Sequence, residues 1–161
     1  MAQAEIIEVA FVLEGDRKPQ IYEVEPGVTV GGFIELVIER TGRGELEEVA
    51  IEDAEDILAA EVLLAEVLVG AFKVLHVAKG GRVKVFVTFN NQVREEAFRP
   101  AASMRKVTRW AIAAFELEGE VADFQLKLND EVLPPETHVG QVSGGHKELR
   151  LHLVMKSKPQ G

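Results

Sequence analysis

The sequence predicts an α+β fold in which one small domain occurs twice. The strand and helix patterns of residues 6–77 return in the same order over residues 82–155, which indicates an internal repeat. The charge also changes midway. Residues 1–79 hold 6 Lys and Arg against 17 Asp and Glu, whereas residues 80–161 hold 12 against 10. A length of 161 residues suits two small domains.

This repeat sets the expected boundaries. We expect an acidic first domain over residues 1–78, a linker at 79–81, a second domain over 82–156 and a flexible C-terminal tail at 157–161. Gly80 and Gly81 favour a simple flexible linker, and a proteolytic processing site is the alternative.

The first half opens with a predicted β-hairpin. Apolar residues alternate with other residues through 6–25 around a turn at 15–19. A helix then begins after Thr29, a candidate N-cap, and stops at Thr41 and Gly42. The apolar face of this helix holds Val30, Phe33, Ile34, Val37 and Ile38.

The remainder of the first half is less regular. A short strand is expected at 49–51, an acidic loop at 52–56 and a closing strand at 72–77, with 78–81 as a candidate linker stretch. Residues 57–69 are compatible with a helix or with a strand and a helical turn, because periodicity alone does not separate these.

The second half repeats this order. Strands are expected at 82–89 and 93–99, followed by a helix that begins after Ser103 and ends near Gly119. The later expected elements are a strand at 122–128, a short strand at 132–133, a helical turn at 139–142 and a closing strand at 149–155. The large aromatic residues Phe33, Phe89, Trp110 and Phe115 are expected in the two cores rather than in ligand sites.

The composition excludes several classes of function. A net charge of −9 without a dense basic stripe argues against nucleic acid and anionic membranes as partners. The absence of cysteine excludes disulfides, thiolate zinc sites and cysteine nucleophiles. No signal peptide and no apolar run of about 20 residues are found, so a cytoplasmic protein is expected.

The sequence contains no motif of catalysis or metal binding. His76 and His152 fall in closing strands and are expected as sheet residues rather than metal ligands, and no histidine stands in HxxxH or HExxH spacing. No serine stands in GxSxG. The acidic stretch 45–56 lacks the spacing of a calcium loop and is interpreted as a solvated face or a docking surface for a basic partner. We therefore expect no enzyme, no metal and no cofactor.

Glycine pairs do not indicate a nucleotide site either. Gly31-Gly32 and Ser143-Gly144-Gly145 lack any phosphate-loop context, so they are expected to accommodate the backbone. The C-terminal stretch is more distinctive, because it is polar and ends on glycine, which leaves its α-carboxylate accessible. The alternative to a functional role for this stretch is the ordinary fraying of a chain terminus.

Several segments resemble ubiquitin and its relatives. Tyr22-Glu23-Val24-Glu25-Pro26 is similar to the second strand of ubiquitin and its stop. The stretch 126–133 resembles the third and fourth strands, and Leu151-His152-Leu153-Val154-Met155-Lys156 resembles the final strand. The resemblance implies two tandem ubiquitin-like β-grasp domains. The chain is similar to the interferon-induced two-domain modifier of vertebrates. It is more similar to the ubiquitin-like proteins of bacterial defence operons, the BilA type.

The resemblance implies a protein modifier that is conjugated through its C-terminus, in bacterial antiviral defence. By position Gly161 would be the conjugated residue, and the tail read by partner enzymes would comprise Lys156, Ser157, Lys158, Pro159 and Gln160. The implied partners are an activating-type enzyme, which uses ATP, a conjugating-type enzyme, a JAB-type metalloprotease and the lysines of target proteins. The tail differs from the family in ending on Gln160-Gly161 rather than on two glycines.

The resemblance also implies a partner-binding surface on the second domain. It places Lys127 at the centre of this surface, with Arg150, His152 and Val154 nearby, so eukaryotic-type ubiquitin receptors should bind poorly. Lys147, Arg150, Lys156 and Lys158 are expected to cluster towards the tail. Two other functions remain open: a non-conjugating tandem β-grasp adaptor that uses residues 45–56, and a sulfur carrier, although sulfur carriers are usually single domains ending in Gly-Gly.

Overall fold

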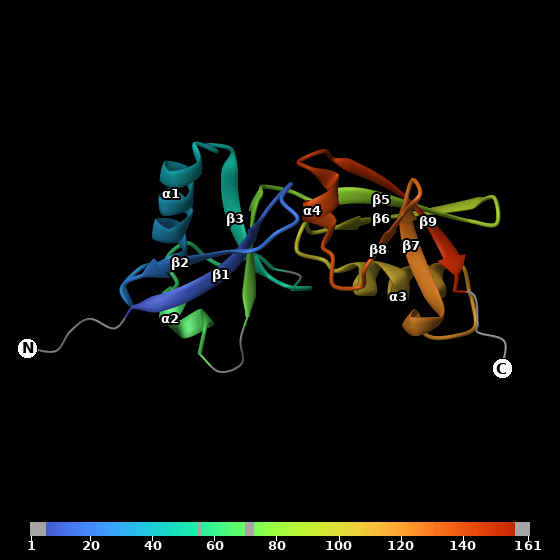
Figure 1. The fold of residues 1–161 in the computed structure, drawn as a ribbon, viewed down its shortest axis with the longest axis horizontal. Coiled ribbons are helices and arrows are strands. Elements are labelled where there is room, and N and C mark those ends of the chain that lie inside the picture. The colour runs from blue at the N-terminus through green and yellow to red at the C-terminus, as the bar shows by residue number, and fades with distance from the viewer. Residues whose placement is uncertain (1–5, 55, 70–72, 157–161) are drawn as a thin grey trace, which may run out of the picture.

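The computed structural model describes residues 6–54, 56–69 and 73–156, which form two β-sheets in succession along the chain (Figure 1). The first sheet has the strand order β2-β1-β4-β3. Its strands are β1 (Ile7–Leu13), β2 (Gln20–Val24), β3 (Leu46–Ile51) and β4 (Val74–Lys79). The first half also contains the helix α1 (Val30–Thr41) and the single helical turn α2 (Leu64–Val67).

The second sheet has the strand order β6-β5-β9-β7-β8. Its strands are β5 (Val83–Phe89), β6 (Gln92–Phe98), β7 (Phe124–Leu128), β8 (Glu131–Leu133) and β9 (Glu148–Met155). The helical elements of this half are α3 (Met104–Ala114), the 3₁₀ turn η1 (Val121–Asp123) and α4 (Val139–Ser143).

Both halves have the same topology. The first strand of each half lies parallel to the last strand at the centre of its sheet and pairs antiparallel with the second. One longer helix, α1 or α3, packs on one face of each sheet. This arrangement is the β-grasp fold, and the predicted fold class of two tandem ubiquitin-like domains is confirmed.

The two main helices begin at the predicted caps. The Thr29 side chain accepts a hydrogen bond from the backbone N–H of Gly32 at 3.0 Å, and the Ser103 side chain accepts one from Lys106 N–H at 3.1 Å. Each bond satisfies one of the backbone donors left free at a helix start. The first helix ends at Gly42, whose φ of 75° is the left-handed conformation that favours glycine.

Several element boundaries differ from the sequence-based expectation. The strand expected at 49–51 begins at Leu46, and the closing strand of the first domain continues through Ala78 and Lys79, which were expected in the linker stretch. Residues 121–123 form a 3₁₀ turn before β7, so that strand is shorter than expected. The segment 57–69, for which the sequence left two alternatives, contains one helical turn. An isolated β-bridge between Thr29 and Leu63 precedes this turn.

The aromatic residues are only partly where they were expected. Phe33 is fully buried in the first core. Phe89, Trp110 and Phe115 are partly buried and pack on the margin of the second core. Trp110 makes an edge-to-face contact with Phe98 at 5.6 Å between ring centroids, and Phe89 lies 5.7 Å from Phe115. These pairs pack against the buried core residues of the second domain.

The second domain covers one face of the first sheet. This closed face, opposite α1, consists of Ala10, Val12, Ala50, His76 and Ala78, which are all at most 7% exposed although none belongs to the first core. Strand pairing brings these residues together. Pro100, Gly140 and Gln141 of the second domain line the small gap that remains against Val12, His76 and Ala78.

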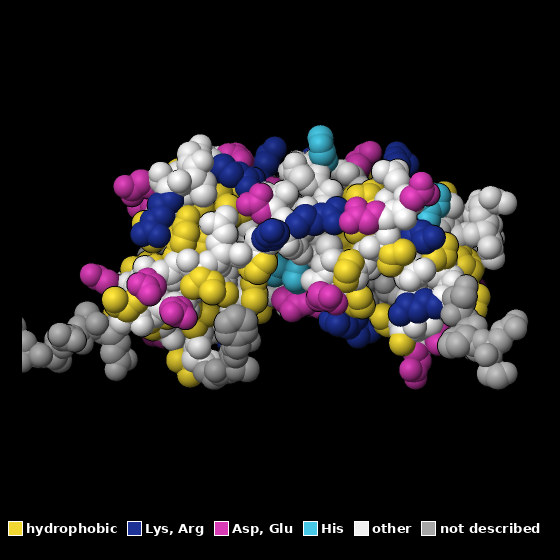
Figure 2. All heavy atoms as spheres, in the orientation of Figure 1, with side chains coloured by type: hydrophobic (Ala, Val, Ile, Leu, Met, Phe, Trp, Pro, Cys, Tyr) yellow, Lys and Arg dark blue, Asp and Glu magenta, His cyan; other side chains and the backbone are white. Residues whose placement is uncertain are grey.

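The junction between the domains is braced by hydrogen bonds. The N–H of Gly81 donates to Glu48 Oε1 at 3.0 Å, and Lys147 Nζ donates to the carbonyl oxygen of Gly80 at 3.0 Å. Charged side chains of both signs follow one another across the middle of the molecule, where the two halves meet (Figure 2). Within the described ranges, no helix is long and apolar enough to cross a membrane.

Candidate functional site

The sheet of the second domain keeps its outer face uncovered. This open face consists of Lys84, Phe86, Lys127, Arg150, His152 and Val154, each intermediate or exposed. Cross-strand pairing aligns Phe86 with Arg150, and Lys127 with His152. The four residues that the sequence suggested as a partner-binding surface, Lys127, Arg150, His152 and Val154, therefore lie on one face of one sheet.

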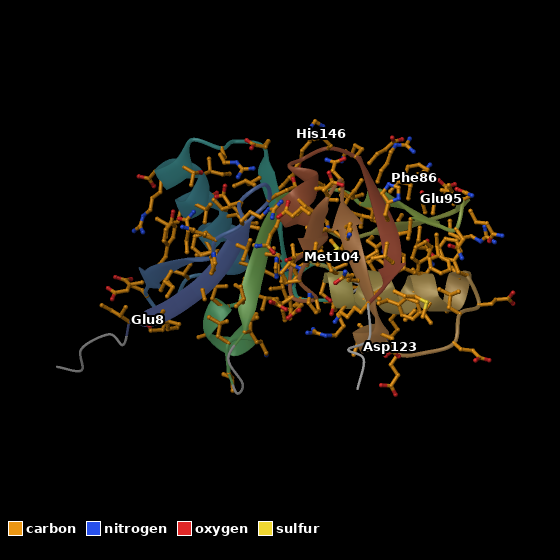
Figure 3. The ribbon with its side chains drawn as sticks, turned by 45° about the vertical axis from the view of Figure 1, so that its right-hand side comes forward. Glu8, Phe86, Glu95, Met104, Asp123 and His146 are labelled. Atoms are coloured by element: carbon orange, nitrogen blue, oxygen red, sulfur yellow. The ribbon has the colours of Figure 1, made fainter. Side chains whose placement is uncertain are left out.

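Phe86 is the central apolar residue of the open face. The guanidinium carbon of Arg150 lies 4.4 Å from the centroid of its ring, within cation–π distance. Glu95 pairs with Phe86 on the neighbouring strand (Figure 3) and its carboxylate lies 4.0 Å from Lys84 Nζ. An aromatic ring capped by a guanidinium group is a typical anchor of protein interfaces.

Sequence reasoning missed Phe86. The signal was present, because Val85 and Val87 alternate with it and point inward. An aromatic residue at an outward strand position, between two buried valines, indicates a residue that the core does not use. The open face can therefore bind a protein surface through an apolar centre flanked by Lys84, Lys127 and Arg150.

The acidic stretch 45–56 supplies contacts to the second domain. Glu48 Oε1 lies 3.6 Å from Arg99 Nη1, and Glu52 Oε1 lies 3.3 Å from His138 Nε2. Asp53 has the closest contact, since its carboxylate accepts hydrogen bonds from the backbone and hydroxyl of Ser103 at 2.7 and 3.0 Å. Much of the predicted docking surface for a basic partner is thus occupied within the chain itself.

Two buried histidines meet at the same interface. The rings of His76 and His138 lie 3.9 Å apart between centroids, and His76 Nε2 has no hydrogen-bond partner among the described residues. His138 Nδ1 lies 3.0 Å from Gln141 Oε1. Burial, followed by the neighbouring His138, lowers the pKa of His76 to about 3. His76 is a sheet residue, as expected, and its ring forms part of the contact between domains.

A second charged contact crosses the boundary near the surface. Arg17 donates two hydrogen bonds to the carboxylate of Glu131, at 2.6 and 3.1 Å, and its carbonyl oxygen accepts one from Gln141 Nε2 at 2.9 Å. The bidentate arrangement fixes the orientation of both groups. Because both side chains are about half exposed, this pair contributes more to orientation than to stability.

The tail begins at the end of the second sheet. The N–H of Lys156 donates to the carbonyl oxygen of Asp123 at 2.9 Å, which holds the last described residue against η1. Ser157, Lys158, Pro159, Gln160 and Gly161 lie outside the described residues. Lys147 directly precedes β9 and Lys156 directly follows it, so they lie about 30 Å apart along the strand. Lys147 and Lys156 therefore lie at opposite ends of the strand, and Lys158 lies outside the described residues.

The remaining candidates are clusters of His, Asp and Glu and the two glycine pairs. No group of three or more His, Asp or Glu side chains within the described ranges has the geometry to hold a metal ion. Gly31 is needed for close packing, because a Cβ there would lie 3.2 Å from the Cβ of Ala60. Gly144 and Gly145 have φ values of 61° and 84° and form the turn after α4. Both glycine pairs thus have structural roles.

Comparison with known proteins gives a family match in the second half of the chain. The family model of BilA ubiquitin-like domain 2 matches residues 84–156. Two solved structures that match are the ubiquitin of Caldiarchaeum subterraneum and the N-terminal ubiquitin-like domain of the 4931431F19Rik protein. They are 13% and 14% identical, have a TM-score of 0.41 each, and each match covers 50% of this chain and respectively 100% and 80% of the other. No curated protein matches the chain. The family match confirms the resemblance to ubiquitin-like proteins of the BilA type for the second domain, and the two sheets supply the tandem arrangement.

Proposed function

We propose that this chain is a ubiquitin-like modifier that becomes covalently attached to other proteins through the carboxylate of Gly161, in bacterial anti-phage defence. The observation that carries the proposal is the match to BilA ubiquitin-like domain 2, which extends through Lys156, the residue directly before the tail. The open face of the same domain adds a surface on which a partner can dock while the tail is engaged.

The proposed chemistry uses one functional group of this chain. The carboxylate of Gly161 attacks the α-phosphorus of ATP on an activating-type enzyme, forming an acyl-adenylate and releasing pyrophosphate. A cysteine thiolate of that enzyme displaces AMP to form a thioester, which is passed to a conjugating-type enzyme. The amine of a target lysine then displaces the thiolate, loses a proton and leaves an isopeptide bond.

The proposal assigns every catalytic group to partners. The chain itself is not an enzyme and holds no cofactor, because ATP is bound by the activating-type enzyme and any thioester sulfur must come from a partner when this chain has no cysteine. A JAB-type metalloprotease would remove the modifier. The need for ATP places the reaction in the cytoplasm.

The proposal is tested by incubating the full chain with ATP and the activating-type and conjugating-type enzymes of a BilA-type operon. We expect a thioester that is lost on treatment with a thiol reductant. Deletion of Gly161 should abolish it, whereas Gly161→Ala, which keeps the length and the carboxylate, should retain part of it. A thioester that forms equally well without Gly161 would overturn the mechanism.

The same deletion separates the modifier from the adaptor alternative. An adaptor that works through residues 45–56 would capture its partner from a lysate with or without the tail. Because Glu48, Glu52 and Asp53 contact the second domain, such an adaptor would have to use the remaining carboxylates of this stretch.

A further inference from the structure

An apolar groove opens on the second domain beside the start of the tail. It has a volume of about 360 Å³ and lies between α3, η1 and the edge formed by β7 and β8. Met104 on α3 and Asp123 at the end of η1 mark its surroundings in Figure 3. Its lining includes Arg105, Thr108, Ala122, Leu126, Leu133 and Lys156. Binding pockets in proteins typically span about 300–1,000 Å³, so this groove has room for large side chains.

The lining of this groove is apolar apart from a few groups. Phe124, Leu126 and Leu133 form its floor as part of the second core. The Thr108 hydroxyl is already engaged, since it donates to the carbonyl oxygen of Met104 at 2.8 Å. The groove therefore offers contact with apolar side chains and no free hydroxyl at its base.

The charged residues of the groove are both cations. Arg105 and Lys156 are exposed at its margin, and neither side chain has a hydrogen-bond or ion-pair partner among the described residues. No carboxylate belongs to the lining, although the whole chain carries a net charge of −9. An occupant with acidic groups beside apolar ones would complement this arrangement.

We propose that this groove binds an extended peptide segment of a partner protein in which apolar side chains stand next to acidic ones. The apolar side chains enter between α3 and η1, and the acidic groups pair with Arg105 and Lys156. Lys156, which directly precedes the tail, lines the groove, so a peptide seated there binds at the end of the second domain. Peptide binding does not require conjugation, so it can be tested independently of the proposed function.

The test is a titration of the ¹⁵N-labelled full chain with a blocked Glu-Leu-Phe-Asp-Asp peptide, followed by amide chemical shifts. We expect the chemical-shift changes to be concentrated at Thr108, Ala122 and Leu126. The peptide should bind more weakly at about 500 mM NaCl than at about 50 mM NaCl. A peptide with Gln and Asn in place of the acids, and one with Ser in place of Leu and Phe, should each bind at least about tenfold more weakly.

Matched variants locate the site. Arg105→Gln should weaken binding about tenfold, whereas Arg109→Gln, one turn further along α3 and outside the lining, should leave it unchanged. Ala122→Trp should fill the groove and block binding, and Ala113→Trp, on an exposed position of α3, serves as its control.

Several outcomes would overturn the proposal. They are absence of shifts at these amides, equal binding of the uncharged peptide, or binding of decanoate but not of the peptide, which would assign the groove to a fatty acid. If deletion of residues 157–161 shifts the same amides without added peptide, the chain's own tail is the occupant. Loss of peptide binding with intact thioester formation would reject only this inference, and the reverse result would reject only the proposed function.

Discussion

A single carboxylate of the first domain binds the N-cap residue of a helix in the second. Asp53 lies in a loop with φ of 60°, a conformation that asparagine and aspartate tolerate better than most residues. It receives two hydrogen bonds from Ser103 at the start of α3, a helix whose own first turn contains no acidic residue. A negative charge at this position interacts favourably with the helix dipole. The Ser103 hydroxyl also accepts a hydrogen bond from Lys106 N–H. The pair of Asp53 and Ser103 therefore belongs both to the N-cap of α3 and to the contact between the domains.

The substitution Asp53→Asn isolates this charge. Asparagine keeps the left-handed backbone and part of the hydrogen bonding, so we expect a loss of about 1–2 kcal/mol in the free energy of unfolding from the missing charge. Urea denaturation measures it. Asp56→Asn, at an exposed position of the same loop, is the matched control. Equal stability of the two variants would contradict the proposed role of Asp53.

His76 makes the stability depend on pH in the acidic range. Its pKa is lowered to about 3 by burial and by His138, whereas an unfolded histidine titrates near its ordinary value of 6.5. Between these values the unfolded chain binds a proton that the folded chain excludes, so stability should fall as the pH drops from about 6.5 towards 3. Burial raises the pKa of the nearby Glu14, which acts in the opposite direction because its folded form takes up a proton first.

Denaturation across this pH range with His76→Gln measures the effect. The variant should show a flatter decline of unfolding free energy below pH 6.5 than the wild type, and His152→Gln, on the open face, should not. An unchanged slope in His76→Gln would show that this ring does not govern the acid sensitivity.

At the scale of elements, α4 joins the two domains through backbone contacts. The N–H of Gly140 donates to the carbonyl oxygen of Pro100 at 2.9 Å, and its own carbonyl oxygen accepts from the N–H of Gly15 at 2.8 Å. A Cβ on Gly140 would lie 2.8 Å from the Cβ of Pro100, closer than real Cβ contacts. The helix therefore fits between the two segments only with glycine at this position.

Gly140→Ala should push α4 away from Pro100 and weaken the bond to Gly15. A destabilisation of about 1–3 kcal/mol is expected from this overpacking, measured as a lower Tm. Gly27→Ala, where a new Cβ meets nothing within 4 Å, is the control and should leave the Tm nearly unchanged. A wild-type Tm in Gly140→Ala would mean that the contact relaxes without cost.

The elements themselves were largely predictable, and their assembly was not. Alternation located the hairpin of 6–25, and Thr29 and Ser103 marked both main helices, because these signals are local. Ala10, Ala50 and Ala78 stand at outward positions, where such small apolar residues hint at a covering partner. What covers them depends on contacts such as Asp53 with Ser103, 50 residues apart in the chain, which periodicity cannot reveal. The open face was predicted in part, without Phe86.

At the scale of the whole molecule, the second domain buries one face of the first sheet and leaves its own outer sheet face open, so we expect the two domains to move as one body. The closed face corresponds in topology to the open face, but the second domain buries it. A chain with two independent domains of this fold would offer two such surfaces, whereas the described residues of this chain offer one. Binding to the open face should therefore show a stoichiometry of one partner per chain.

Relaxation of ¹⁵N amides tests whether the domains move together. Amides of β1 and of β5 should report the same rotational correlation time in the wild type. Ala50→Glu places a charge on the closed face, which is costly to bury without a partner, and should give the domains shorter and separate correlation times. Ala113→Glu, at an exposed position, should not. Independent tumbling in the wild type would contradict the single body.

The hydrogen bonds around Gly80 and Gly81 have a consequence for proteolysis. A cut between these two glycines would break one peptide bond and leave the contacts of Asp53, His76 and Arg17 across the boundary in place. The product would be a nicked complex of two fragments that co-purify under native conditions and separate in denaturant. Release of the second domain would thus need two events, cleavage of the chain and dissociation of the halves.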